Sequence, residues 1–243
     1  MSFFYSLYNE ALYRPLFNAL VGIYQALPVQ DLGLAIIILT VAIRLVLTPI
    51  LWKGQKAQKT MALLQPEIKR IQEKFKSDRE AQGKALMELY ATNKINPLSG
   101  CLLALVQLPI LIALFHVFQR GLDPAQLQFL YSFIPGPGVI NPVSLGILDL
   151  SKGNIYLGVI AAVSQFLQMK LSLPSGVPKQ GGKDFASIMQ KQSLYIFPVV
   201  ILVWSYTLPS ALTLYWTAIN LFGIVQEIIV KKFAKTAEKN QPQ

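Results

Sequence analysis

Charged residues are scarce in this chain of 243 residues. They make up 14% of the sequence, and hydrophobic residues make up 53%, whereas a soluble domain carries about 25% charged residues. The chain has one cysteine, Cys101, and one histidine, His116, which excludes an intrachain disulfide and the Cys/His patterns of zinc sites. Several apolar runs are too long for ordinary core helices. These features predict an all-α polytopic membrane protein.

The sequence also lacks the common catalytic motifs. It contains no GxSxG elbow, no HExxH motif and no pair of aspartates within an apolar run. We therefore expect no enzymatic activity and neither a nucleotide nor a metal cofactor. The first residues lack the Lys/Arg-rich start of a cleavable signal peptide, so we expect the mature chain to begin at or near Met1.

One charge interrupts the most apolar run of the chain. Residues 32–51 contain a single charged residue, Arg44, slightly past the middle of the run. A charge at the centre of a membrane span costs ~2.5–3.5 kcal/mol and usually faces protein or water. The only acidic residue in any predicted span is Glu227, at the cytoplasmic end of the last one, where we expect a solvated carboxylate. Arg44 is therefore predicted to face water, polar side chains or lipid phosphate.

Apolar runs and polar segments divide the chain into ten parts. The five predicted spans are residues 32–52, 98–118, 155–173, 194–208 and 210–230. The other parts are an extracytoplasmic interfacial helix at 1–31, a cytoplasmic helical hairpin at 53–97, an extracytoplasmic loop at 119–154, a cytoplasmic loop at 174–193 and a basic cytoplasmic tail at 231–243.

The interfacial helix is predicted from a polar stripe. Ser6, Glu10, Arg14 and Asn18 recur every four residues on an otherwise apolar helix, a pattern typical of helices that lie in the membrane interface. Pro15 and Pro28 are expected to bend or end this helix. A further full span over residues 3–26 is the alternative.

The hairpin is predicted from its own apolar seam. Leu64, Ile68, Ile71 and Phe75 are spaced four, three and four residues apart, as in packed helix pairs. Ser77-Asp78 could cap the second helix of the pair.

The distribution of charge sets the orientation. Segments 1–31 and 119–154 have net charges of −1 and 0, whereas segments 53–97, 170–193 and 227–243 have +5, +3 and +2. Because cytoplasmic loops carry the excess of Lys and Arg, the N-terminus is predicted outside and the C-terminus in the cytoplasm.

Polar residues within the spans suggest a wet cavity. Thr40, Arg44 and Thr48 share one helix face because they are four residues apart. Further polar or aromatic candidates are Gln165 and Gln168 in the third span and Thr213, Tyr215, Trp216 and Asn220 in the last. For Thr48 and Asn220 hydrogen bonding between helices is the simpler interpretation. For Arg44 we favour a cavity that attracts anionic groups.

Several blocks resemble the YidC/Oxa/Alb family of membrane protein insertases. They are the Arg44 span ending in LTPI, the hairpin sequence QPEIKRIQEKF, NPLSGCLLALVQLPILIALF in the second span and FPVVILVWSYTLPSALTLYWTAIN in the last two. The resemblance covers residues 10–232 and implies a five-helix bundle with a hydrophilic groove open to the cytoplasm and to lipid.

The resemblance also implies roles for individual residues. Arg44 falls on the family's groove arginine and Thr40 on the polar residue one turn earlier. The substrate-contacting aromatic pair falls on Tyr215 and Trp216, and a polar groove residue of the third span falls on Gln165 or Gln168. With Asn220 these form the expected substrate groove.

The implied partners are nascent membrane proteins and the lipid bilayer of the plasma (inner) membrane, with the ribosome and a Sec translocon as further candidates and no direct nucleic-acid binding. The given chain lacks the large extracytoplasmic domain of the proteobacterial type, and its short tail weakens the case for ribosome docking. A small-solute transporter or channel is the alternative function, and an intramembrane enzyme is the third.

Overall fold

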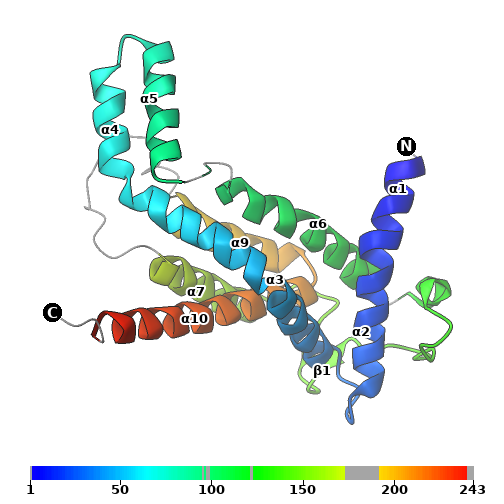
Figure 1. The fold of residues 1–243 in the computed structure, drawn as a ribbon. Coiled ribbons are helices and arrows are strands. Elements are labelled where there is room, and N and C mark those ends of the chain that lie inside the picture. The colour runs from blue at the N-terminus through cyan, green and yellow to red at the C-terminus, as the bar shows by residue number, and fades with distance from the viewer. Residues whose placement is uncertain (1, 95, 97–98, 121–122, 173–191, 240–243) are drawn as a thin grey trace. The chain divides into compact units, whose positions relative to one another are not determined.

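The computed structural model describes residues 2–94, 96, 99–120, 123–172 and 192–239, and these residues are predominantly helical (Figure 1). The predicted all-α polytopic membrane fold is confirmed. The first half contains α1 (Ser2–Tyr8), a π-helical turn (Asn9–Tyr13), α2 (Arg14–Ala26), α3 (Leu32–Leu63), α4 (Gln65–Lys74), α5 (Arg79–Thr92) and α6 (Ser99–Arg120). The second half contains a 3-10 turn (Pro124–Phe129), β1 (Val143–Ser144), β2 (Leu148–Asp149), α7 (Ile155–Ser172), a π-helical turn (Gln192–Ile196), α9 (Phe197–Thr207) and α10 (Ser210–Lys239).

The described residues form two compact units. One contains the residues up to Val46, from Pro109 to Ser172 and from Gln192 onward, and the other contains those from Leu47 to Leu108. The expected cytoplasmic loop at 174–193 lies almost entirely outside the described residues. Of the expected basic tail, residues 231–239 continue α10.

Three described stretches are long and apolar enough to cross a membrane, namely Leu32–Ala57, Ile155–Ser172 and Ser210–Lys232. They coincide with the predicted first, third and fifth spans. Two shorter apolar helices, Val106–Arg120 and Leu194–Thr207, lie within or at the predicted second and fourth spans. The division into five spans remains a prediction.

The N-terminal helix continues past Pro15. A π-helical turn precedes α2, and the Arg14 N–H bonds to the carbonyl of Asn9. Pro15 lacks the N–H that would continue the α-helical hydrogen bonds, and the π-helical turn immediately before it accommodates this loss. The helix ends at Ala26 because Leu27 is extended, as expected for a residue before a proline, here Pro28.

The predicted polar stripe on this helix is only partly exposed. Glu10 and Arg14 form an exposed ion pair with an N–O distance of 3.2 Å. Asn18, in contrast, is buried. Its amide nitrogen donates to the carbonyl of Phe129 at 2.9 Å, and its oxygen accepts from the Tyr131 N–H at 2.6 Å. Asn18 of the stripe thus holds the loop after α6 through Phe129 and Tyr131, whereas Glu10 faces outward.

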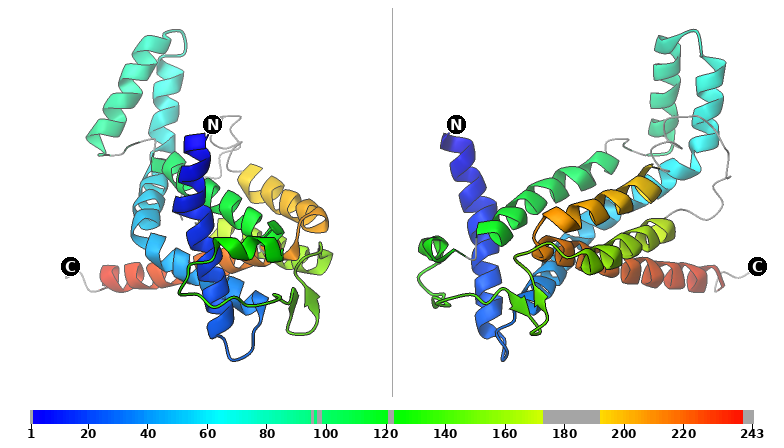
Figure 2. Two further views of the ribbon diagram at one scale, coloured as in Figure 1. Left: turned by 90° about the vertical axis from the view of Figure 1, so that its right-hand side faces the viewer. Right: turned by 180° about the vertical axis from the view of Figure 1, so that it is seen from behind.

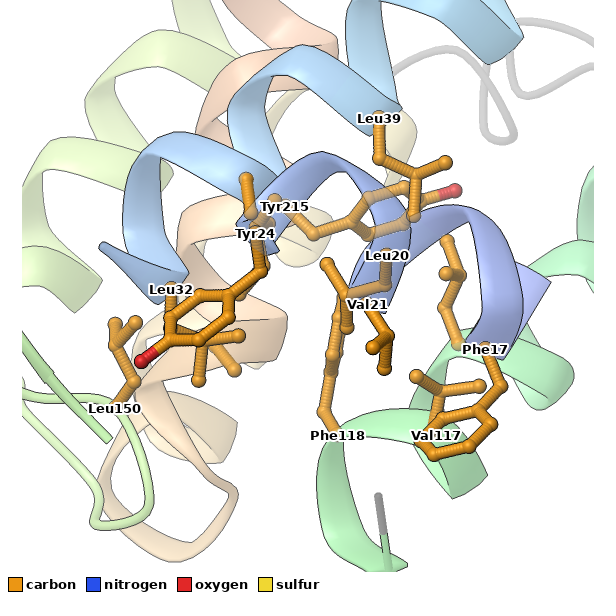
Figure 3. Close-up of a cluster of buried hydrophobic side chains, with 14 of the residues drawn as sticks. Phe17, Leu20, Val21, Tyr24, Leu32, Leu39, Val117, Phe118, Leu150 and Tyr215 are labelled. Carbon is orange, nitrogen blue, oxygen red and sulfur yellow. The ribbon is translucent and has the colours of Figure 1, made fainter. Parts of the chain in front are cut away.

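The opposite face of α2 belongs to the main hydrophobic core. Figure 3 shows buried side chains from α2, α3, α6, α10 and the loop before α7: Phe17, Leu20, Val21, Tyr24, Leu32, Leu39, Val117, Phe118, Leu150 and Tyr215. The residues from α3 and α10 lie near the beginnings of these helices, and those from α6 lie near its end. α2 lies crosswise to α7 and α10 (Figure 2). The hydrophobic core therefore lies at the end of this unit that α2 crosses.

The second unit contains the predicted helical hairpin. α3 continues beyond the predicted end of the first span because no strong helix breaker follows Pro49 until Pro66. α4 and α5 pack side by side, and Leu64 and Ile68 of the predicted apolar seam are buried. The Asp78 carboxylate accepts from the backbone N–H of Ala81 at 3.0 Å, which confirms the predicted cap of the second helix.

Candidate functional site

Arg44 lies on α3 where the helix changes from buried to exposed. Thr40, one turn earlier, is buried, and its hydroxyl donates to the carbonyl of Ile36 at 2.6 Å. Arg44 itself is half-buried, and the next two residues, Leu45 and Val46, are 60% and 75% exposed. The guanidinium thus belongs to the part of α3 that the first unit covers least.

Arg44 has an aromatic neighbour from α10. Its charge interacts electrostatically with the phenol of Tyr215. Tyr215 is fully buried in the hydrophobic core, with its ring tilted against Phe118 at a centroid distance of 6.4 Å. The structure therefore brings together Arg44 and Tyr215, two residues that the sequence placed in one site.

Trp216 and Tyr215 contact different neighbours. It is half-buried and stacks on Trp204 of α9, with ring centroids 5.9 Å apart and planes at 18°. Trp204 is exposed, so the pair of indoles forms an aromatic surface between α9 and α10. The expected substrate-contacting pair is thus divided, with Tyr215 in the core and Trp216 beside Trp204. Sequence analysis gave Trp204 no role, because its contact depends on how two helices pack.

Asn220 joins α10 to α7. It is buried, and its amide nitrogen donates to the Ser164 hydroxyl at 3.1 Å and to the carbonyl of Ala161 at 3.4 Å. This geometry matches the simpler sequence interpretation of Asn220, hydrogen bonding between helices. Such bonds average about 0.6 kcal/mol in membrane proteins.

The two glutamines of α7 are half-buried. Gln168 packs over Gly223 of α10, where an added Cβ would lie 3.1 Å from the Gln168 Cγ. Its amide nitrogen donates to the Ser172 hydroxyl at 3.2 Å. Gln165 lies almost one turn earlier on the same helix. Of the two, Gln168 is the one that the structure shows packed at the α7–α10 contact.

The expected solvation of Glu227 is wrong. Its side chain is buried, with 2% of the residue exposed, because it faces inward on α10. Asn220 and Glu227 are seven positions apart, which places both on one helix face. One turn later Lys231 donates to the carbonyl of Leu171 at 2.5 Å, at the C-terminal end of α7, where a cation is favourable. The heptad spacing of 220 and 227 is the sequence signal that could have revealed this polar seam.

The comparisons with known proteins agree with the resemblance. Residues 23–239 match the family described as 60Kd inner membrane protein. The chain is 38% identical over 206 residues to a membrane protein insertase YidC of Fusobacterium nucleatum, which covers 84% of this chain and 88% of that protein. It is 37% identical over 213 residues to the membrane protein insertase YidC of Francisella tularensis subsp. novicida, which covers 87% of this chain and 34% of that protein.

A solved structure is also similar. The crystal structure of an active YidC insertase with the first transmembrane domain resolved aligns with a TM-score of 0.56 and 29% identity, over 90% of this chain and 46% of that chain. The present chain thus spans about a third of the Francisella relative and less than half of the solved protein, but most of the Fusobacterium relative. By the extent of these matches, the chain belongs to the 60Kd inner membrane protein family, whose similar members are named YidC membrane protein insertases.

Proposed function

We propose that this chain inserts proteins into the inner membrane by way of a hydrophilic groove in which Arg44 supplies the positive charge. The observation that carries the proposal is the position of Arg44, half-buried on α3 immediately before the exposed Leu45 and Val46. A charge at the centre of an apolar span is costly and marks a functional site by default. The relatives' name supports the same function, and nothing in the comparisons favours a small-solute transporter or channel.

In the proposed mechanism a substrate's hydrophilic extracytoplasmic segment enters the groove from the cytoplasm. The guanidinium of Arg44 attracts its acidic residues and compensates part of their desolvation. The apolar segment of the substrate then moves past α3 and α10 into lipid. Burial of about 20 apolar residues supplies the driving force, and the membrane potential adds ~2.3 kcal/mol per negative charge moved outward per 100 mV.

The remaining site residues have supporting roles in this proposal. Thr40 and the two glutamines, Gln165 and Gln168, supply neutral polar surface that tolerates a passing peptide without holding it by charge. Trp216, stacked on Trp204, offers an aromatic surface for the substrate's apolar segment. Asn220 and Tyr215 are buried, so they position the helices that line the groove.

The proposal includes the orientation and partners expected from the sequence. The N-terminus is outside and the C-terminus is in the cytoplasm, where the hairpin of α4 and α5 receives the substrate. Nascent membrane proteins are the substrates, and the ribosome and a Sec translocon are candidate partners. No enzymatic step and no cofactor is required.

The test follows insertion of a single-span substrate that has an acidic N-terminal segment. Arg44→Ala should lower its insertion about tenfold, because one charge contact at ~4 Å is worth ~1–4 kcal/mol between water and a protein surface. Arg44→Lys, which keeps the charge, should restore most of it. Insertion is measured by protease protection in proteoliposomes that contain the purified full chain.

A matched substrate distinguishes charge attraction from misfolding. When the acidic residues of the substrate are replaced by Asn and Gln, insertion should become insensitive to Arg44→Ala. If Arg44→Ala impairs both substrates equally, the residue acts on the fold of the protein. If it impairs neither, the electrostatic mechanism fails.

A further inference from the structure

The hairpin of β1 and β2 ends in an apolar turn at the same end of the first unit as the start of α3. We propose that this turn, Leu145 to Ile147, is a lipid-binding anchor seated in the membrane interface, and that Asp31 is the residue that fixes its orientation. The surface would bind the boundary between lipid headgroups and acyl chains. It has no part in the groove proposed above.

Asp31 is a buried carboxylate that ties the hairpin to α3. Its Oδ1 accepts from the Leu34 N–H at 2.9 Å, which caps α3, and from the Ser144 hydroxyl at 2.8 Å. Its Oδ2 accepts from the Leu145 N–H at 2.6 Å. One side chain thus holds both the first turn of a spanning helix and the turn of the hairpin.

The contact between hairpin and helix is close. A Cβ added at Gly33 would collide with the Ser144 hydroxyl oxygen and with the Ser144 Cβ, so only glycine allows this approach. The hairpin itself is held by antiparallel strand pairing, in which Val143 lies opposite Asp149 and Ser144 opposite Leu148. The hairpin therefore cannot shift along α3 without losing several contacts.

The turn carries an apolar side chain in a backbone conformation that disfavours it. The Ile147 N–H closes the turn on the carbonyl of Ser144 at 3.1 Å, and the two central residues, Leu145 and Gly146, have φ of 50° and 72°. Asn or Gly is the usual choice at the first of these positions, because a leucine is strained at positive φ. A leucine that is strained and also exposed points to a contact outside the chain.

The side chains of the turn are exposed and uncharged. Leu145 is 68% exposed and Ile147 is 86% exposed. Residues 141–148 contain no charged residue, so nothing in this segment opposes entry into lipid. An exposed apolar patch on an otherwise ordered element marks an interaction surface.

The depth of the turn favours lipid as the occupant. Because the Leu145 N–H bonds to Asp31, the turn lies level with the first turn of α3, where the apolar run begins. Leu34 and Ile38 are exposed on that part of α3, and on a spanning helix such side chains contact lipid. Lipid is therefore already present at the level of the turn.

Two exposed tyrosines lie at the same end of the unit. Tyr156 is in the first turn of α7 and Tyr206 in the last turn of α9, and both side chains are exposed. The loop after β2 joins these helices, since the Asn154 N–H bonds to the carbonyl of Ser205 at 2.9 Å. Tyrosines at helix ends typically lie in the interface of a membrane. The apolar turn and this aromatic pair would then face the same lipid layer.

The test measures the depth of a fluorophore at position 147. In a Cys101→Ser background, Ile147→Cys is labelled with an environment-sensitive dye, and the full chain is reconstituted in nanodiscs. Ser151→Cys, exposed in the same loop, is the matched control. The dye at 147 should be quenched at least twice as strongly as the dye at 151 by lipids spin-labelled near the headgroup, and less strongly by aqueous iodide.

Asp31 is tested in the same labelled chain. Asp31→Asn keeps the size of the side chain but cannot accept hydrogen bonds at both atoms, and Ser144→Ala removes one donor only. Lipid quenching at 147 should fall about twofold in Asp31→Asn and less in Ser144→Ala, with both variants measured below their own melting temperatures so that the loss of quenching reports the turn and not unfolding. Unchanged quenching in both variants would remove Asp31 from the proposal.

Two outcomes would overturn the lipid anchor. If iodide quenches the dye at 147 as strongly as at 151, the turn is in water. If neither quencher reaches it, a protein surface such as a second copy of the chain covers the turn.

Discussion

The two parts of α3 in the first unit differ in how they are packed. From Leu32 to Thr40 most residues are buried against α2 and the ends of α6 and α10, whereas from Val41 to Val46 no residue is fully buried. α10 shows the same change, since most residues from Ala211 to Asn220 are buried and most from Leu221 to Val230 are not.

Under the proposed insertion mechanism, this difference separates the part of α3 that stabilises the fold from the part that meets the substrate. The packed part contains the hydrophobic core that holds α2, α3, α6 and α10 together. Arg44 lies in the part with little packing, where movement costs few contacts. A chain that must let a substrate pass between its helices and lipid can do so only where the helices are not locked by core side chains. The comparison leads to three predictions, given from the largest expected effect to the smallest.

Loss of a core side chain should have the largest effect. Phe17 on α2 is fully buried, with 0% exposed, and Phe17→Ala should lower the free energy of unfolding by about 3–5 kcal/mol, the usual cost of an aromatic cavity. Thermal unfolding in nanodiscs measures this loss. Phe133→Ala is the matched control, since Phe133 is 78% exposed and its loss should cost less than about 1 kcal/mol. Similar losses in both variants would mean that the core does not hold the packed end.

An added methyl group at the start of α7 should have a smaller effect. A Cβ at Gly158 would collide with Ser205 of α9, so Gly158→Ala should cost about 1–3 kcal/mol by overpacking. Gly83 of α5 is the matched control because nothing lies within 4 Å of its added Cβ, and Gly83→Ala should instead stabilise its helix by about 0.5–1 kcal/mol. Unfolding curves of the two variants should therefore shift in opposite directions, and a Gly158→Ala variant as stable as wild type would contradict the close α7–α9 contact.

The features that could be predicted from the sequence are those that depend on local patterns of residues. Long apolar runs predicted the three described stretches that are long and apolar enough to cross a membrane, since the length of such a run sets whether it can cross a bilayer. Asp78 was predicted as a cap because its carboxylate is followed at once by a helical pattern, and it accepts two backbone N–H groups. Asn220 was interpreted as a hydrogen bond between helices, and its contact with Ser164 agrees.

The features that the sequence did not predict depend on which helices meet. Glu227 was expected in water because it lies near the end of a span, but its burial depends on the inward face of α10. The expected partners Tyr215 and Trp216 are adjacent in sequence, and neighbouring residues on a helix point in different directions. The role of α2 in the core was missed because its polar stripe indicated a surface helix. The groove itself remains a prediction.

Acid should weaken the packed end by the smallest amount. The carboxylate of Asp149 receives hydrogen bonds from the Lys152 ammonium and from Ser151, and these lower its pKa to about 2. For Asp31, burial alone would raise the pKa. Hydrogen bonds from the N–H groups of Leu145, Leu34 and Gly33 and from the Ser144 hydroxyl together outweigh it, so the pKa is also lowered. Both carboxylates therefore stabilise the fold fully above their unfolded pKa of about 3.9 and lose that contribution as the pH falls through the folded values.

The measurement compares melting temperatures between pH 5 and pH 2 in nanodiscs. Wild-type protein should lose more stability across this window than Asp149→Asn, and the two curves should converge near pH 2. The contribution of Asp149 to the loss of stability should be small because its ion pair with Lys152 is exposed to solvent. Asp31→Asn should also reduce the loss of stability across this window, because the pKa of the Asp31 carboxylate is lowered in the folded protein as well. Arg44→Lys should leave the curve unchanged in this window, because both cations stay protonated and the packed end does not depend on them. An acid transition that is identical in wild type and Asp31→Asn would mean that the packed end is held by its apolar side chains alone.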